Sequence, residues 1–271
     1  MYVGAHGSGN KASAQIIKDH GGNLIQIFVN SLRTSYSEYL ELKKFLEDNQ
    51  MKCVVHASYT INLSRDWDQY SGWIQQFIME ISLAHQVGAI AIVVHMGKQM
   101  ELELAEAYNN MYTALLYVHD QTIKYSSLKI LLETPTGQGS EICYKIEDMA
   151  YFFKKFSRNK NPNISNRFGL CVDTCHVFAA GYNLVTKAAI YAYLEAFEEL
   201  IGLRHLYLIH LNDSKQEVGS NVDRHENIGK GKIGKLGLTE IVKYFKNLKI
   251  PIILETPAER ILEDLLFIVD L

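Results

Sequence analysis

Apolar runs rich in β-branched residues recur about every 20 to 45 residues along the chain. Eight such runs span residues 2–6, 24–29, 53–59, 89–95, 129–134, 168–173, 206–212 and 250–256. Several are almost continuous (AIAIVVH, KILLET, LYLIHL, PIILET), which is typical of strands buried on both faces of a parallel sheet. The pattern therefore predicts eight parallel β-strands.

Segments with helical spacing lie between these runs. Residues 67–86 give the clearest case, and residues 101–124 and 188–201 follow. In the first segment one stripe carries the apolar side chains Trp73, Phe77, Ile78, Ile81 and Ala84. Strands that alternate with helices in this way predict a (β/α)8 TIM barrel.

A doubly wound open sheet is the alternative. It would need a glycine-rich turn after the first strand, but GAHGSGN holds only Gly7 and Gly9 of that pattern and lacks the acidic partner. No Pro/Ser/Gly-rich linker divides the chain, and residues 159–166 (NKNPNISN) read as a surface connection. We therefore expect one domain over residues 1–271.

Side chains of the types that commonly bind metals follow the apolar runs. Five histidines and four carboxylates lie at or just past the ends of six runs: His56, His95, Glu133, Asp173, His176, His210, Asp223, His225 and Glu255. The carboxyl ends of barrel strands form the active-site rim, so these groups should converge there. Any one of them has a simpler explanation, a structural histidine or a helix cap, but their coincidence favours a site for several metal ions.

The mixture of imidazole and carboxylate groups favours zinc, with manganese or iron as alternatives. Nine groups are too many for one tetrahedral catalytic zinc, and they suit three ions if one carboxylate bridges two of them. We expect Cys175, which follows Asp173, to be a buried structural thiol rather than a ligand. His6 ends the first run at the same rim, where it would orient a ligand or a water molecule without binding a metal itself.

Composition limits the possible partners and the compartment. The chain is 48% hydrophobic, and it has neither a signal-peptide pattern nor an apolar run long enough to span a membrane. Four cysteines without a CxxC pattern suggest reduced thiols, so we expect an intracellular monomer without a membrane partner, with cytoplasm, nucleus and viral particle all left open. The net charge of −3 argues weakly against nucleic acid, but three divalent ions would outweigh the four carboxylates locally.

Several motifs, which occur in order along the chain, resemble those of the endonuclease IV family of apurinic/apyrimidinic (AP) endonucleases. They are HASY (56–59), ET (133–134) with GQGS (137–140), DTCH (173–176) with AAGY (179–182), HLND (210–213), VDRH (222–225) and LET (254–256). The pair DTCH and VDRH is the most specific part of this resemblance, which covers essentially the whole chain.

The resemblance implies a TIM barrel with three zinc ions. His56, His95 and Glu133 would hold the first ion, and Glu133 would bridge to a second. Asp173, His210 and Glu255 would complete the second site, whereas the third ion would bind His176, Asp223 and His225. The implied reaction is hydrolysis of duplex DNA on the 5′ side of an abasic site, leaving a 3′-hydroxyl and a 5′-deoxyribose phosphate, with 3′-end cleaning as a further activity. Glu133 and Glu255 would be the catalytic carboxylates, Glu255 by orienting the attacking hydroxide.

The resemblance also implies the DNA contacts. By motif position, Arg33 and Tyr59 would enter the minor groove beside the lesion, while Thr60 replaces an apolar residue that is common in the family. Lys230, Lys232 and Lys235 form a basic stretch just after the third-ion residues, and we expect Lys230 and Lys232 to contact phosphates. Without the resemblance, Arg33 would be an ordinary loop arginine and Tyr59 a strand-end aromatic. For the lysine stretch, which is predicted from its charge and position and not from the resemblance, the alternative is a solvated loop.

Two other functions fit parts of this pattern. A metal-dependent sugar isomerase or epimerase resembles this chain in its barrel and paired metal site, but two ions suffice there, so His176, Asp223 and His225 argue against it. A non-catalytic DNA-binding or metal-storage module would not require a bridging carboxylate among nine converging ligands.

Overall fold

The protein is described here from a computed structural model, which covers residues 1–29 and 35–271. Eight parallel strands close into a barrel with the neighbour order β1-β10-β7-β6-β5-β4-β3-β2. The strands are β1 (Val3–His6), β2 (Leu24–Phe28), β3 (Lys52–His56), β4 (Ala91–His95), β5 (Lys129–Glu133), β6 (Phe168–Asp173), β7 (Leu206–His210) and β10 (Ile252–Leu254). The predicted TIM barrel is confirmed, and each predicted run overlaps one of these strands.

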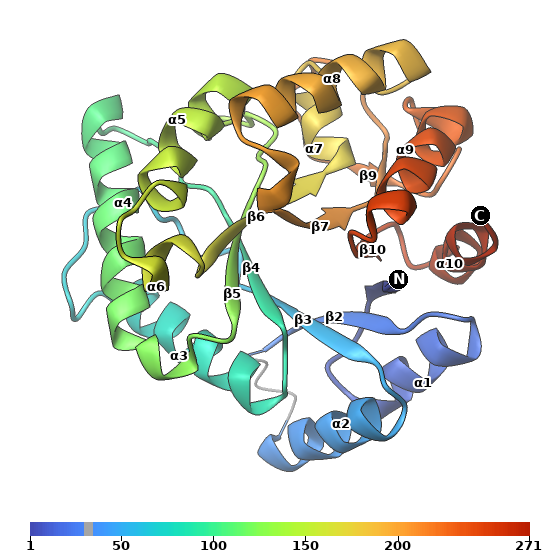
Figure 1. Ribbon diagram of the computed structural model, residues 1–271, viewed down its shortest axis with the longest axis horizontal. Coiled ribbons are helices and arrows are strands. Elements are labelled where there is room, and N and C mark those ends of the chain that lie inside the picture. The colour runs from blue at the N-terminus through green and yellow to red at the C-terminus, as the bar shows by residue number, and fades with distance from the viewer. Residues whose placement is uncertain (30–34) are drawn as a thin grey trace.

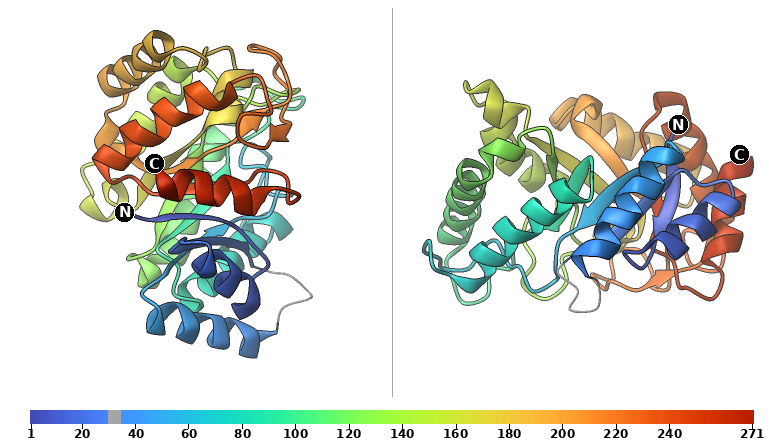
Figure 2. Two further views of the ribbon diagram at one scale, coloured as in Figure 1. Left: turned by 90° about the vertical axis from the view of Figure 1, so that its right-hand side faces the viewer. Right: turned by 90° about the horizontal axis from the view of Figure 1, so that it is seen from below.

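Helices surround the barrel (Figure 1). They are α1 (Lys11–Asp19), α2 (Tyr36–Asp48), α3 (Gly72–Gln86), α4 (Leu104–Gln121), α5 (Ile146–Ser157), α6 (Pro162–Ser165), α7 (Thr174–Ala179), α8 (Lys187–Leu200), α9 (Gly234–Leu248) and α10 (Ile261–Asp270). Short 3-10 turns cover Ile123–Tyr125 and Leu203–His205, and β8 (Asp213–Ser214) pairs with β9 (His225–Glu226). Helix α10 packs against β1, so both chain ends lie on one side of the barrel (Figure 2).

An apolar plug fills the inside of the barrel. It consists of Leu24, Val54, Ala91, Val93, Leu131, Cys171, Leu208 and Ile253, all of them buried. A second, larger core lies between the strands and the helices. The strand register then places polar residues side by side above the plug, since His95 is the partner of Glu133, and Asp173 is the partner of His210.

The predicted start and the predicted buried stripe of the helix over residues 67–86 need correction. Helix α3 begins at Gly72 rather than at residue 67, because the Asp68 side chain accepts hydrogen bonds from the Tyr70 amide and the Ser71 hydroxyl and so forms a turn. Its buried stripe includes Ile74, whereas Trp73 and Ile78 are only partly buried.

The predicted surface connection at 159–166 contains the short helix α6. The side chain of Asn161 caps this helix and Pro162 begins it, a favourable pair at a helix start. Within the part of the chain that the structure describes, no helix is long and apolar enough to cross a membrane.

Candidate metal centre

The nine predicted metal ligands converge at the carboxyl end of the barrel. Five of them are the last residues of strands: His56, His95, Glu133, Asp173 and His210. Glu255 lies one residue past β10, His176 lies in the first turn of α7, and His225 begins β9 with Asp223 two residues before it. The site therefore combines rigid strand ends with one long loop between β8 and β9.

The carboxylate of Glu133 lies at the centre of this group and is almost completely buried. Its Oε2 atom lies 3.2 Å from His56 Nε2 and 3.0 Å from His95 Nε2. Its Oε1 atom lies 2.7 Å from His210 Nδ1. Imidazoles thus approach both oxygens of one carboxylate, as a bridging ligand between two ions requires.

A second cluster adjoins Glu133. Ligand atoms of Glu133, Asp173, His210 and Glu255 all lie within 4.8 Å of one another. Glu255 Oε2 lies 3.2 Å from His210 Nδ1. These four residues are the set that the family resemblance assigns to the second ion.

A third cluster joins His176, Asp223 and His225, whose ligand atoms also lie within 4.8 Å of one another. Asp223 Oδ2 lies 3.3 Å from His176 Nε2, and Oδ1 lies 3.3 Å from His225 Nε2. Asp173 Oδ2 is 3.5 Å from His225 Nε2, so Asp173 lies between the second and third clusters. His95 has a side chain that is 33% exposed, more than the other histidines of the centre.

Backbone carbonyls fix the orientation of three of these rings. The Nδ1 atoms of His56 and His176 lie 2.8 Å from the carbonyl oxygens of Ala57 and Thr134, and His225 Nδ1 lies 3.1 Å from that of Glu255. A carbonyl oxygen can only accept, so Nδ1 carries a proton and Nε2 faces inward, where it would present its lone pair to a metal ion. The family motif residue Asp173 also caps α7 by accepting from the His176 amide, which sets the position of that ring.

Two buried nitrogens show that the third cluster suits a metal. The Nε2 atoms of His176 and His225 form no well-aligned hydrogen bond within the described residues and face carboxylate oxygens at 3.3 to 3.5 Å. Buried polar atoms normally have partners, and inward-facing imidazole lone pairs beside a carboxylate are the ligands that zinc prefers. The donor set of this structure therefore fits the metal ions that the sequence predicts.

The carboxylates of the centre favour positive charge beside them. Burial favours the neutral form of His176, but Asp173 and Asp223 outweigh it and raise the pKa of His176 well above its usual range. Burial likewise opposes ionisation of Glu255, yet His210 and other imidazoles lower its pKa to about 2. Glu133 also has a pKa well below the usual range, because the charge of His210 overcomes the effect of its burial. Metal cations would take the place of the imidazole protons that these carboxylates attract.

The cysteines are buried thiols. The Cys175 thiol lies near Asp173 and His225, and burial raises its pKa to about 12, which disfavours the thiolate that a metal ligand must become. All four cysteines are buried and free, which agrees with the prediction of reduced thiols.

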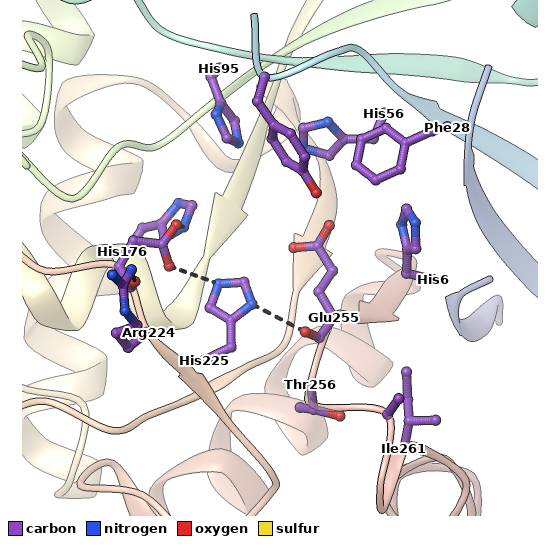
Figure 3. A pocket seen from close by; sticks show the side chains of 13 residues that line it. His6, Phe28, His56, His95, His176, Arg224, His225, Glu255, Thr256 and Ile261 are labelled. Atoms are coloured by element: carbon purple, nitrogen blue, oxygen red, sulfur yellow. Dashed lines mark hydrogen bonds and ion pairs between the residues drawn. The ribbon is translucent and has the colours of Figure 1, made fainter. Parts of the chain in front are cut away.

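A cavity of about 570 Å³ opens above the clusters. Figure 3 shows its lining, with the Glu255 carboxylate and the histidine rings pointing into it. Its aromatic wall contains Phe28, which the sequence did not single out, and Tyr59, which is 71% exposed. The two rings pack with centroids 5.0 Å apart, so Tyr59 stands at the cavity mouth.

His6 and Arg33 have different outcomes. His6 lines the cavity, and its Nδ1 atom lies 3.4 Å from the Gln26 amide nitrogen, so it contacts a neighbour of the ligands rather than a ligand. Burial lowers the pKa of His6 to about 4, which keeps the ring neutral. Arg33 lies outside the described residues, and its role stays a prediction.

Asp213 shapes the basic stretch, although sequence reasoning gave it no role. Its fully buried carboxylate accepts hydrogen bonds from the backbone amides of Gly229, Gly231, Ile233 and Gly234. Gly231 leaves no room for a side chain, because a Cβ would lie 2.5 Å from Asp213 Oδ1. The loop that carries Lys230 and Lys232 is therefore wrapped around one carboxylate.

Asp213→Ala should lower the free energy of unfolding by about 3 kcal/mol, because it removes hydrogen bonds from a charged acceptor, worth about 1.5–3 kcal/mol each, and leaves the buried Ile233 amide without a partner. Asp213→Asn, which keeps one acceptor oxygen, should lose less. Urea unfolding followed by circular dichroism measures both values. An unchanged midpoint in Asp213→Ala would show that the loop holds its shape without this carboxylate.

The three lysines differ in their surroundings. Lys230 is exposed, and Lys232 Nζ lies 2.6 Å from the Glu217 carboxylate. Lys235 Nζ lies over the Phe267 ring of α10 at 4.8 Å. Lys230 and Lys232 thus remain candidates for phosphate contact, whereas Lys235 packs on a helix.

Comparison with known proteins agrees with the geometry. The family model described as "Xylose isomerase-like TIM barrel" matches residues 14–270. A probable endonuclease 4 of Haloquadratum walsbyi is 32% identical over 96% of this chain and 93% of its own length. The crystal structure of endonuclease IV from Thermus thermophilus superposes with a TM-score of 0.77 at 25% identity and covers 98% of this chain and 99% of that one.

A D-tagatose 3-epimerase-like protein also superposes, with a TM-score of 0.71 over 100% of this chain and 98% of that one, but its 18% identity supports the shared barrel alone. The endonuclease relatives match in sequence as well as in fold, along nearly the whole chain. The chain therefore belongs to the endonuclease IV family and is a nuclease.

Proposed function

We propose that this protein hydrolyses duplex DNA at the phosphodiester 5′ to abasic sites, leaving a 3′-hydroxyl and a 5′-deoxyribose phosphate. The observation that supports this proposal most directly is that both oxygens of the buried Glu133 carboxylate face imidazole nitrogens, at 2.7 to 3.2 Å, between adjoining groups of candidate ligands. This arrangement suits several metal ions that act on one phosphate. The same chemistry would remove blocking groups from 3′ ends.

Three ions would be held by the residues that the resemblance assigns. His56 and His95 would join Glu133 at the first ion, and the more exposed His95 still brings Nε2 to 3.0 Å from Glu133. The second and third ions would use the four-residue and three-residue clusters described above. When bound, zinc ions supply Lewis-acid stabilisation of the phosphate and lower the pKa of the attacking water.

The chain's own side chains contribute orientation. The lowered pKa of Glu255 keeps its carboxylate ionised, and Oε2 faces His210. The carboxylate can therefore accept a hydrogen bond from a water molecule in the cavity and orient the lone pair of that water toward phosphorus. Neutral His6 adds a polar group to the cavity wall without adding a competing cation. Glu133 and Glu255 are thus the carboxylates to which we assign catalysis.

The cavity also suits an extruded, baseless nucleotide. An abasic residue loses little stacking when it leaves the duplex, and the cavity of about 570 Å³ has room for a sugar and its phosphate. Tyr59 at the mouth offers a flat ring that would stack beside the lesion. We place Tyr59 and Arg33 in the minor groove on the strength of the family resemblance.

Replacing Lys230 and Lys232 together by Gln should weaken DNA binding at all sequences. Each lost phosphate contact reduces the slope of log affinity against log salt by about 0.9. Fluorescence anisotropy with an abasic duplex at several salt concentrations measures this slope. The matched double substitution replaces two exposed lysines at the opposite rim, Lys52 at the start of β3 and Lys249 before β10. Equal slopes for the two double variants would assign Lys230 and Lys232 to solvent.

A sugar isomerase or epimerase is the second candidate function, and only the shared barrel fold supports it. Such an enzyme needs two ions, and the cluster of His176, Asp223 and His225 would then have no role. No observation favours it over the nuclease assignment.

The direct test is a duplex with one tetrahydrofuran abasic analogue, incubated with the zinc-loaded protein. We expect a single nick 5′ to the analogue and no cut in the undamaged duplex. A strong chelator should abolish the nick slowly, because most ligands are buried. Turnover of free ketoses with an intact abasic duplex would overturn the proposal.

A further inference from the structure

Gln26 is a polar residue in the middle of the otherwise apolar strand β2. Its side chain is completely buried, and its strand neighbours in register are His6 on β1 and Val54 on β3. A buried amide with no access to water must find its hydrogen bonds inside the protein. The contacts of this amide therefore show what the barrel holds in place.

The Gln26 amide contacts residues of the candidate metal centre and its cavity. Oε1 lies 2.8 Å from His210 Nε2, and Nε2 lies 2.6 Å from Glu255 Oε1. The same amide nitrogen lies 3.4 Å from His6 Nδ1. Gln26 thus joins side chains from three other strands or strand ends.

Hydrogen-bond chemistry allows only one orientation of this amide. The NH₂ group of Gln26 donates to Glu255 Oε1, so the amide oxygen faces His210. An oxygen also only accepts, so Nε2 of His210 carries a proton. Nδ1 of His210 faces the carboxylates of Glu133 and Glu255, at 2.7 and 3.2 Å, and would offer its lone pair to a metal ion that takes the place of the proton there.

His210 differs in this respect from three other histidines of the centre. His56, His176 and His225 turn Nε2 inward, and each has its Nδ1 atom held by a backbone carbonyl. His210 turns Nδ1 inward, and a side chain holds its far nitrogen. The orientation of His210 is therefore the one among these four that a substitution can remove.

We propose that Gln26 is a positioning residue that presets His210 and Glu255 as ligands of the same metal ion. One amide fixes the His210 tautomer through its oxygen and the Glu255 carboxylate through its nitrogen. This inference rests on the proposed metal-dependent function, since it assigns both partners to the second ion. Gln26 is completely buried, so its effect acts through the ligands.

The test compares zinc-loaded wild-type protein with Gln26→Met and Gln26→Glu. Met matches the length of Gln but makes no amide hydrogen bond, while Glu keeps the size and an acceptor but loses the donor to Glu255. Ile27→Met is the matched control, because Ile27 is the next residue of β2, equally buried, and packs in the outer core.

We expect both Gln26 variants to bind zinc about 10–100-fold more weakly than wild type, the usual loss when a ligand's outer partner is removed, and so to release it faster to a chromogenic chelator. The turnover number on the abasic duplex should fall by a similar factor with little change in KM. Substitution with cobalt should give a visible absorption spectrum that differs from wild type, whereas Ile27→Met should match wild type in all three measurements. If Gln26→Met fails to fold by circular dichroism, Gln26→Glu carries the same test.

The results that would overturn the inference also separate it from the proposed function. Wild-type zinc retention, cobalt spectrum and kcat in the Gln26 variants would show that the amide only fills space, even if the melting temperature falls. A wild-type protein that binds no zinc would overturn the proposed function and this assignment together. Zinc binding and incision by the wild type with an unaffected Gln26→Met variant would overturn this assignment alone.

Discussion

Glu255→Gln should lose about 10²–10³-fold of its incision rate, in the range seen when one group that stabilises the transition state is removed. The amide has nearly the same shape as the carboxylate but carries no charge. It would weaken the second ion site and could no longer accept strongly from the attacking water. The side chain is only 15% exposed inside the cavity, so affinity for abasic DNA should stay close to that of wild type.

Single-turnover incision of a tetrahydrofuran duplex and fluorescence anisotropy with the same duplex separate these two effects. Glu259→Gln is the matched control, because Glu259 is an exposed carboxylate four residues further along the same loop. Substantial incision by Glu255→Gln would refute the role that we assign to this carboxylate.

Removal of the metal ions should lower the melting temperature by roughly 10 °C. Metals that bind only the folded state stabilise it by about 4 kcal/mol when free metal exceeds the dissociation constant a thousandfold. In a chain of this size each kcal/mol corresponds to about 2–4 °C. The physical reason is that Glu133, Asp173 and other ionisable groups are buried close to one another, and bound cations would offset the repulsion between their carboxylates.

Differential scanning fluorimetry with and without chelator measures this shift. Zinc should restore the lost stability after the chelator is removed, whereas magnesium should not, because magnesium prefers all-oxygen ligands. Equal melting temperatures for the chelated and zinc-loaded protein would contradict a metal centre in these residues.

The barrel and the convergence of the ligands were predictable because both depend on simple periodicity. Strands such as KILLET and PIILET are apolar throughout, and parallel strands bring their carboxyl ends to one rim. Residues that end those runs, such as Glu133 and His210, consequently meet. The ends of the predicted runs were less accurate, as the three-residue strand β10 shows.

The supporting residues were not predictable in the same way. Gln26 interrupts an apolar strand, which signals a buried polar contact but does not name its partners. Those partners are 184 and 229 residues away in sequence, and only the closed barrel brings them together. Asp213 looked like part of the motif HLND, and its hold on a loop up to 21 residues further on depends on backbone amides that have no sequence signature.

The Asp213 carboxylate has a consequence for how this nuclease can change over time. It binds the loop through main-chain N–H groups, so these contacts do not involve the side chains at positions 230 and 232. Charge at those two positions can be gained or lost while the path of the backbone stays the same. With the phosphate contacts that we propose for Lys230 and Lys232, selection could adjust the strength of DNA binding one lysine at a time while the candidate metal ligands stay in place.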